Sequence, residues 1–382
     1  MAKTIKHALT WTLLAASIVG CSSNTIKVEK VKPNPLPKLE TATASLAEVQ
    51  RFSVASLPAA ERGHIRIDTD GQALYTADPN GEVTAYVKGK RLWQVRPTKQ
   101  LTAGVSVGDQ LAVVANGKGE IFALDRQTGK LAWQQNVTGA VLAPSLIHAN
   151  RVVSISNDGT VYAHNAANGQ VFWTYKLPNV QLSLRGQAAP VLLDDRTVLV
   201  ATANAYVYAI DIITGAPRWQ RRVAVSEGRS DIQRLIDIDG QPVVYDRYMV
   251  TASYQGQVTA IDLSNQRVIW SNDASSIHQP LVTEQQVIVS QTNGKITAYS
   301  LSNGQQVWEL DSLLNRKLSN PVLLGQRIVV GDLDGVLHIV DPATGQLIGR
   351  SKTRGEVSHL RVIGDQLYVS TSKGALSVWQ NR

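Results

Sequence analysis

The sequence predicts an all-β protein, an eight-bladed β-propeller whose blades are four-stranded antiparallel sheets. A unit of about forty residues, clearest at residues 103–133, recurs along most of the 382-residue chain. Within each unit, short runs of alternating apolar and polar residues are separated by turn signals, which is typical of strands. Because eight units follow one another at this spacing, a closed propeller is the fold that we expect.

The first twenty residues have the pattern of a secretory signal peptide. Lys3 and Lys6 precede an apolar core from Leu9 to Val19, and Gly20 stands directly before Cys21. A small residue before a cysteine at this place resembles the bacterial lipobox, so we expect a signal peptide over 1–20 and lipid on Cys21. The alternative is an ordinary signal peptide followed by an incidental cysteine. By the same resemblance, Ser22 after the cysteine favours the outer membrane.

Residues 21–45 are predicted to be a flexible tether that follows the lipidated cysteine. The segment is polar, and Pro33, Pro35 and Pro37 alternate in it, a composition that cannot build a packed core. The propeller is then expected over residues 46–382.

One turn residue marks every copy of the repeat. Its positions are Gly81, Gly119, Gly159, Ala205, Gly256, Gly294, Gly335 and Gly374. Asn-Gly and Asp-Gly pairs at this point predict a two-residue hairpin turn, in which glycine supplies a positive φ. In the fourth copy Ala205 must adopt that conformation, or the turn must change.

Six of the eight tryptophans occupy one repeat position: Trp93, Trp133, Trp173, Trp219, Trp270 and Trp308. A row of tryptophans can line a sugar-binding or quinone-binding surface. A fixed place in every blade favours packing between blades instead, because each indole buries on the order of 200 Å². We therefore interpret these residues as structural.

The last copy is incomplete and predicts how the ring closes. It ends at Arg382 after its third strand, and the seventh copy has Gly349 in place of the tryptophan. Residues 48–56 have strand character, with Phe52 where a blade tryptophan would fall. We expect this N-terminal strand to complete the C-terminal blade, which would remove the open sheet edges.

Two copies are too long, and their insertions predict a binding surface. The turn residues before and after Ala205 lie 46 and 51 residues away, and the extra residues fall within 175–190 and 220–242. Both insertions connect one blade to the next, so they lie at the same end of the ring, beside the fourth blade. The residues suited to protein recognition are Leu182, Leu184 and Arg185 in the first insertion and Asp237 and Asp239 in the second. The alternative is that the leucines fold back onto the blade and the charges are only solvated.

Charge and composition exclude several classes of function. The formal net charge is +8, or +6 without the first twenty residues, and no Lys/Arg cluster is interleaved with aromatic residues. We therefore expect no nucleic acid partner. With a single cysteine and seven scattered histidines, we also expect no disulfide, metal site or cofactor.

The repeat resembles the quinoprotein-type, or PQQ-like, propeller repeat in its turn glycine, its Ala-apolar-Asp strand and its Gly-x-x-x-Trp ending. With the lipobox and the segments LSLRGQAAP and LIDIDGQPVV, the whole chain resembles the BamB family, the propeller lipoproteins of the outer-membrane β-barrel assembly (BAM) complex.

This resemblance implies a non-enzymatic scaffold that is anchored through Cys21 on the periplasmic face of the outer membrane. It implies binding to the POTRA domains of BamA, contact with other BAM-complex members, and a role in handling unfolded outer-membrane proteins. The family's interaction positions fall on Leu182, Leu184, Arg185, Asp237 and Asp239. The alternatives are a periplasmic dehydrogenase that uses pyrroloquinoline quinone, and a ligand-binding propeller sensor.

Overall fold

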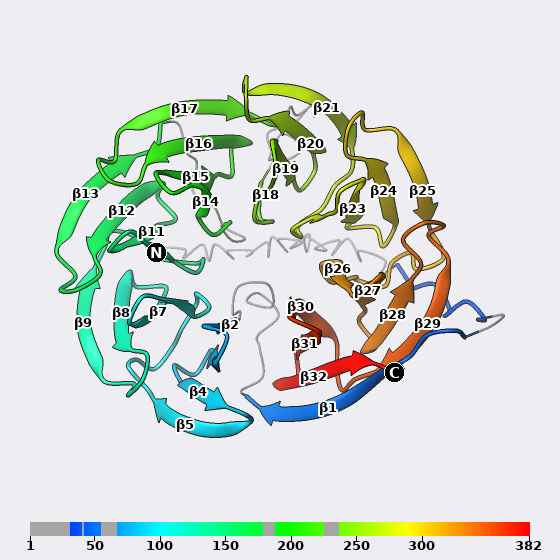
Figure 1. Cartoon of the computed structure of the whole chain (residues 1–382), viewed down its shortest axis with the longest axis horizontal. Coiled ribbons are helices and arrows are strands. Elements are labelled where there is room, and N and C mark those ends of the chain that lie inside the picture. Colours follow the sequence, from blue (N-terminus) through cyan, green and yellow to red (C-terminus); the bar gives the residue numbers. More distant parts are fainter. Residues whose placement is uncertain (1–30, 40–41, 55–66, 179–187, 225–236) are drawn as a thin grey trace, which may run out of the picture. The chain divides into compact units, whose positions relative to one another are not determined.

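Eight four-stranded antiparallel sheets follow one another around a ring (Figure 1). The computed structural model describes residues 31–39, 42–54, 67–178, 188–224 and 237–382, and the ring belongs to the compact unit Pro33–Arg382. The predicted all-β propeller is therefore confirmed, with thirty-two strands in the described ranges. No helix in those ranges is both long and apolar enough to cross a membrane.

Each blade runs from a first strand at the ring axis to a fourth strand at the rim. Blades 1 to 4 consist of β2(Asp68–Thr69), β3(Ala73–Ala77), β4(Val83–Val87) and β5(Lys90–Val95); β6(Ser106–Gly108), β7(Leu111–Ala115), β8(Glu120–Asp125) and β9(Leu131–Asn136); β10(Leu146–His148), β11(Arg151–Ile155), β12(Thr160–Asn165) and β13(Val171–Lys176); and β14(Val191–Asp194), β15(Thr197–Ala201), β16(Tyr206–Asp211) and β17(Pro217–Arg222).

Blades 5 to 8 continue the same order. They consist of β18(Val243–Tyr245), β19(Tyr248–Ala252), β20(Gln257–Asp262) and β21(Arg267–Asp273); β22(Leu281–Val282), β23(Gln286–Ser290), β24(Ile296–Ser300) and β25(Gln306–Leu310); β26(Val322–Leu324), β27(Arg327–Gly331), β28(Val336–Val340) and β29(Leu347–Lys352); and β30(Val357–Ile363), β31(Gln366–Thr371), β32(Ala375–Asn381) and β1(Leu46–Ser53).

Two ends of the ring can be distinguished by their connections. At one end, which we call the insertion face, the turn between the second and third strands lies beside the connection to the next blade. In blade 2, for example, the Val137 amide donates to the Gly119 carbonyl at 2.9 Å. The opposite face carries the turn between the third and fourth strands. Both insertions belong to the insertion face.

The turn between the second and third strands is longer than predicted. Asn116 and Glu120 are paired by their backbones, and the three residues between them end at Gly119, whose φ is 82°. The two-residue prediction was therefore wrong: the loop is a three-residue turn that ends in a left-handed residue. In the fourth copy Ala205 adopts this conformation with a φ of 61°. The fifth copy differs, because its positive φ of 51° is at Gln255, one residue before the turn residue Gly256.

Five of the six repeated tryptophans join one blade to the next. Their indoles are buried, and each N–H donates at 2.8–3.0 Å to a carbonyl in the turn between the third and fourth strands of the following blade. A glycine of that turn lies against each ring; in blade 6, a Cβ on Gly304 would come within 2.6 Å of the Trp270 indole. Each indole therefore fills the space that a side chain at the turn glycine would occupy, and it supplies the hydrogen-bond donor for a carbonyl of the same turn.

The joint between blades 4 and 5 is different. Trp219 is only half-buried, and the glycine position that faces it is occupied by Gln266, whose φ is 60°. The Arg221 guanidinium donates to the Gln266 carbonyl at 2.9 Å. Because a Cβ at this position occupies the space that the indole takes in other blades, Trp219 does not seat as deeply.

Substitutions at the turn position that faces the indole are expected to change the free energy of unfolding in a way that depends on whether glycine is removed or introduced. Gly304→Ala should destabilise the protein by at least about 1 kcal/mol, because a Cβ would meet the Trp270 ring and φ is +72°. Gln266→Gly should leave stability unchanged or raise it. Urea unfolding of both variants measures the difference. Equal losses would show that the indole–glycine contact does not matter.

The seventh blade replaces the tryptophan joint with the N-terminal segment. Gly349 pairs with Ile339, where other blades pair tryptophan with alanine. A Cβ on Gly349 would lie 1.9 Å from the Ala44 carbonyl oxygen, and the Thr43 amide donates to the Ile348 carbonyl at 2.9 Å. The missing indole thus leaves room for the chain that leads into β1.

The N-terminal strand closes the ring as predicted. β1 pairs antiparallel with β32 from Leu46↔Asn381 to Ser53↔Ala375. The tryptophan position of this strand falls on Gln50 and not, as expected, on Phe52, because Gln50 pairs with Val378 and lies against Gly89 of blade 1. Phe52 is buried and packs against Tyr86 of blade 1, with ring centroids 4.6 Å apart. At the ring axis, the Arg361 guanidinium donates at 2.6 Å to a carboxylate oxygen of Asp68. Blades 8 and 1 are therefore joined at both the rim and the axis.

The segment predicted to be a free tether is partly held by the propeller. The Asn34 amide donates to the Leu314 carbonyl at 3.0 Å, and the Asn34 carbonyl accepts from Arg316 at 2.8 Å. The compact unit that contains the propeller accordingly begins at Pro33.

A buried ionic cluster fixes this attachment. Asp332, in the turn between β27 and β28, accepts from Arg316 at 2.8 Å and from His338 at 2.9 Å. All three side chains are at most 3% exposed. Burial of Asp332 disfavours its charge, but the bonds from His338 and Arg316 outweigh this effect and keep the pKa of Asp332 below its ordinary value. Arg316 also pairs with Asp334.

One buried histidine predicts a pH dependence of stability. His164 is fully buried between Trp133 and Tyr162, and burial lowers its pKa to about 4. Since the unfolded imidazole titrates near 6.5, the unfolded chain binds the extra proton first. The free energy of unfolding should therefore fall by about 3 kcal/mol as the pH drops from roughly 7 to 4.

His164→Leu should remove most of this pH dependence, because leucine occupies the equivalent place in blade 2 as Leu124. Urea unfolding of both proteins at the two pH values tests the expectation. The same pH dependence in both proteins would rule out His164 as its source.

Candidate functional site

The two insertions precede and follow the fourth blade, and their described ends lie on the insertion face. The first leads from β13 to β14 and the second from β17 to β18. Leu182, Leu184 and Arg185 lie outside the described residues, as does Cys21. Asp237 and Asp239 are described, so the geometry of the surface is built from these two residues and from the ends of both insertions.

The second insertion rejoins the propeller through a buried isoleucine. Ile238 is fully buried, and Asp237 and Asp239 on either side of it are half-exposed. The Tyr254 amide, in the turn of blade 5, donates to the Asp237 carbonyl at 2.7 Å. The alternation of apolar and acidic residues thus turns Ile238 inward and leaves Asp237 and Asp239 partly exposed, with one carboxylate oxygen of Asp239 buried.

Gly240, which follows Asp239, holds the end of the second insertion against the connection between blades 5 and 6. A Cβ on Gly240 would lie 2.4 Å from the His278 carbonyl oxygen, so only glycine allows this close approach. The His278 ring in turn bonds to the Leu318 carbonyl at 2.8 Å. The backbone that carries the two aspartates is therefore fixed on both sides.

The C-terminal end of the first insertion reaches the same core as Ile238, and its N-terminal end packs in the neighbouring core between blades 3 and 4. Leu177 and Ala188, which precede and follow its undescribed part, are buried, and the Leu177 amide donates to the Gly159 carbonyl at 2.9 Å. Ala188 and Ile238 belong to one hydrophobic cluster, together with Leu199 of β15 and Met249 of β19. Both insertions are thus seated on the packed joint between blades 4 and 5, and that joint positions them together.

The rim of blade 4 is rich in arginine. The edge strand β17 has the sequence PRWQRR and is largely exposed. Arg218 and Arg196 share the Asp211 carboxylate at 2.7 and 3.1 Å, and the bond from Arg218 holds the pKa of Asp211 well below its usual range. Two cations thus face one carboxylate. Proline and arginine also protect this edge from pairing with another strand.

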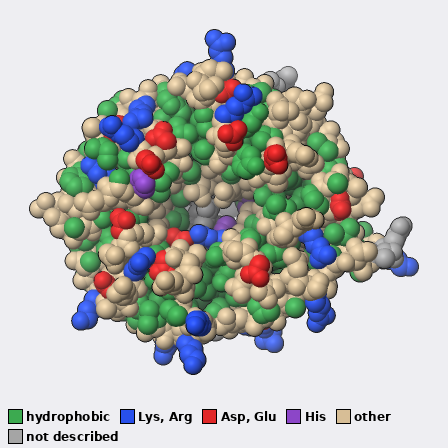
Figure 2. All heavy atoms as spheres, viewed as in Figure 1, with side chains coloured by type: hydrophobic (Ala, Val, Ile, Leu, Met, Phe, Trp, Pro, Cys, Tyr) green, Lys and Arg blue, Asp and Glu red, His purple; other side chains and the backbone are tan. Residues whose placement is uncertain are grey.

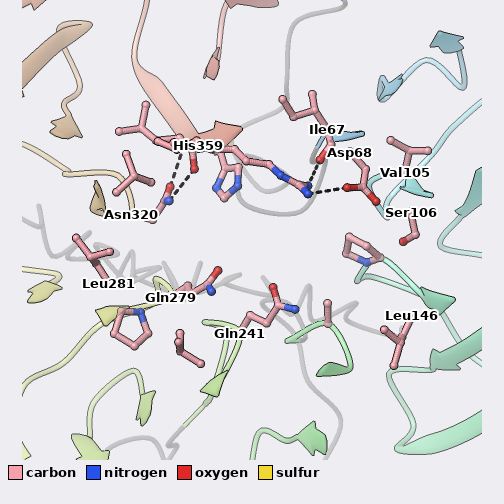
Figure 3. A pocket seen from close by; sticks show the side chains of 18 of the residues that line it. Ile67, Asp68, Val105, Ser106, Leu146, Gln241, Gln279, Leu281, Asn320 and His359 are labelled. Atoms are coloured by element: carbon pink, nitrogen blue, oxygen red, sulfur yellow. Dashed lines mark hydrogen bonds and ion pairs between the residues drawn. The ribbon is translucent and has the colours of Figure 1, made fainter. Parts of the chain in front are cut away.

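A cavity of about 590 Å³ lies at the ring axis. Figure 3 shows Gln241 and Gln279 on one wall, opposite His359. Leu146, Leu281 and other residues of the first strands supply most of the remaining wall. In the described ranges, no three His, Cys, Asp or Glu side chains come close enough to share a metal ion. Of its charged lining residues, Arg361 and Asp68 bond to each other to close the ring.

Figure 2 shows the hollow at the centre of one face of the ring. Most Lys and Arg side chains visible there lie around the periphery, and acidic side chains lie nearer the hollow. The chemistry of the axis is thus that of packed amides and aliphatic side chains, and the charge that a partner could recognise lies on the outer surfaces.

Sequence reasoning did not identify Ile238 as the residue that seats the second insertion, nor the Arg316–Asp332–His338 cluster. The alternation in LIDIDG was a usable signal for Ile238. His338 stands where most other copies have a threonine, tyrosine or phenylalanine, and that departure could have pointed to the ionic cluster.

Comparisons with known proteins agree on one family. A family model described as "Outer membrane protein assembly factor BamB" matches residues 79–310 and 293–381. Proteins of that name from Bordetella pertussis and Escherichia coli K12 are 31% and 30% identical, over 95% and 89% of this chain and 94% and 90% of their own lengths.

The crystal structure of BamB from Moraxella catarrhalis superposes with a TM-score of 0.81 and 35% identity, covering 88% of this chain and 100% of that one. A europium-containing methanol dehydrogenase reaches a TM-score of 0.69 at 14% identity, covering 88% of this chain and 93% of its own. That second likeness shows a shared fold alone.

Proposed function

Because the chain belongs to the BamB family of outer-membrane protein assembly factors, we propose that it is a lipid-anchored scaffold that binds the POTRA domains of BamA. Its family relatives are named for assembly, and this chain is likewise an assembly factor and not an enzyme. The single observation that supports a dedicated binding surface is the shared seat of both insertions. Ala188 of the first and Ile238 of the second lie in one core.

The proposed surface consists of Leu182, Leu184, Arg185, Asp237 and Asp239. Two aliphatic side chains beside a guanidinium and two carboxylates suit a protein partner with an apolar patch and charged groups of both signs. The two carboxylates stand on a backbone that is held by Tyr254 and by the approach of Gly240 to His278. A rigid surface loses little conformational entropy on binding.

Anchoring through Cys21 is the second part of the proposal. The signal-peptide pattern places the cysteine just after the expected cleavage point, and thirteen residues later Asn34 is bonded to the propeller. Acyl chains on Cys21 would keep the propeller at the periplasmic side of the outer membrane, where other BAM-complex members assemble.

Unfolded outer-membrane proteins are proposed as further, weaker partners. The edge strands β9 and β13 expose Leu131, Val171 and Phe172 at 45–54%, and an edge strand offers unpaired backbone groups to an extended chain. Unlike β17, these two edges have neither proline nor arginine.

Binding of purified chain to the purified POTRA region of BamA tests the function. A stoichiometric complex on size-exclusion chromatography is the expected result, and the complex should also be recovered from detergent-solubilised outer membranes. Separate elution of the two proteins at micromolar concentration, with both folded, would contradict the proposal.

A further inference from the structure

The insertion face carries a group of exposed cations on the side of the ring away from the insertions. Lys317 lies in the connection from blade 6 to blade 7, Lys352 and Arg354 lie at the connection from blade 7 to blade 8, and Lys373 lies in the adjacent turn of blade 8. These four residues, which we call the basic arc, are all exposed. In the described ranges, none of them is within ion-pair distance of a carboxylate.

Acidic residues do not neutralise the basic arc. Asp311 and Glu356 belong to the same connections, and Asp334 is occupied by Arg316. Four cations therefore face two further carboxylates on this part of the surface. At physiological ionic strength charges interact over about 8 Å. An extended anionic surface can come within that distance of several of these cations at once, whereas a single small anion cannot.

The chain leaves the propeller beside the basic arc. Arg316 immediately precedes Lys317 and holds the Asn34 carbonyl, and the Asn34 amide is bonded to Leu314. Within the described residues, the attachment nearest to the proposed anchor is therefore on the insertion face, at the joint of blades 6 and 7. From Cys21 to Asn34 the chain has thirteen residues, which span at most about 45 Å.

We propose that the basic arc rests on anionic lipid head groups of the membrane that anchors the chain. This inference depends on the proposed lipidation of Cys21. A short anchor keeps this side of the propeller close to the bilayer, and each basic side chain near an anionic surface strengthens the attraction about fivefold. Blade 4, next to which the insertions leave and rejoin the propeller, lies across the ring from blades 7 and 8 (Figure 1), so the lipid contact and the proposed partner-binding surface lie on opposite sides of the same face.

Site-specific fluorescence on the full-length lipidated protein tests the contact. Because Cys21 is the single cysteine of the sequence and its thiol is blocked in the lipidated protein, one new cysteine can be labelled selectively. The test position is Ser372→Cys, next to Lys373. The control position is Gln127→Cys, an exposed residue on the opposite face. Vesicles of phosphatidylcholine with or without phosphatidylglycerol carry a lipid whose head group quenches the dye.

Quenching at position 372 should be several-fold stronger than at position 127 in vesicles with phosphatidylglycerol, and high salt should remove the difference. The charge-reversed variant K317E/K352E/K373E should lose it as well. The matched variant K88E/K90E/K130E, with the same change in net charge on exposed lysines of the opposite face, should keep it.

Equal quenching at the two positions, or a difference that survives in K317E/K352E/K373E, would overturn the proposal. An equal loss in both charge-reversed variants would also overturn it, since net charge alone would then explain the effect. Flotation with neutral phosphatidylcholine vesicles reports on the anchor separately. Failure of lipidation is thereby distinguished from failure of the lipid contact.

Discussion

A chain that begins at Ile65 is expected to lose cooperative unfolding. It lacks β1, so β32 becomes an open edge, and the buried Leu46 and Phe52 side chains are removed from two core clusters. Burying two such side chains contributes roughly 3–6 kcal/mol, against a total stability of about 5–15 kcal/mol for an ordinary domain. The loss is therefore comparable with the whole stability of the ring.

A chain that begins at Pro33 is the matched control, because it retains β1 and the contacts of Asn34 and Ala44. Thermal unfolding followed by circular dichroism should give one sharp transition for the Pro33 chain. The Ile65 chain should give a broad or much earlier transition. Superimposable transitions would show that strand β1 does not close the propeller.

Removing the carboxylate of Asp332 is expected to have the largest effect of any single substitution. Asp332→Ala leaves Arg316 and His338 buried without this partner and removes the acceptor for the Asp334 and Val336 amides. Breaking a buried ion pair from one side costs about 3–5 kcal/mol. The N-terminal segment should also loosen, because Arg316 holds Asn34.

Ser253→Ala is the control for the turn alone. Ser253 accepts from the Gln257 amide at 2.9 Å in the equivalent turn of blade 5 but forms no ion pair, so its loss should cost about 1 kcal/mol. Urea unfolding compares the two variants, and limited proteolysis near residue 34 reports on the segment. Similar small losses in both variants would mean that the ionic cluster adds nothing to the turn.

The features of the fold that follow from the repeat could be predicted from the sequence. The blade number follows from the spacing of the turn residues, and the closing strand follows from the missing fourth strand before Arg382 together with the strand character around Phe52. Five of the tryptophans lie buried at the joints between blades. These features depend on local pattern and on one copy resembling the next, so they can be read without coordinates.

Features that depend on contacts between distant segments could not be predicted. Gln266 stands where other blades have a glycine, and the effect of this single exchange is that Trp219, 47 positions earlier in the chain, is less deeply buried. The attachment of Asn34 to Arg316 joins residues 282 apart. The tether composition predicts only that the segment cannot form its own core, and it does not show which surface holds it.

The candidate surface is likewise described by the structure only in part. The lengths of the insertions indicated the fourth blade, and the structure explains why Asp237 and Asp239 are presented together, through Ile238. The contribution of Leu182, Leu184 and Arg185 stays a prediction from the sequence.

The most direct measurement of the central claim is the affinity of the variant L182A/R185A/D239A for the POTRA region of BamA. Loss of several central contacts should weaken binding by about a hundredfold or more, or roughly 3 kcal/mol. The variant Q127A/K130A/Q305A, altered at exposed residues of the opposite face, should bind like the unaltered protein. If the first variant is folded and binds within about twofold of the unaltered protein, the two insertions are not the partner-binding surface.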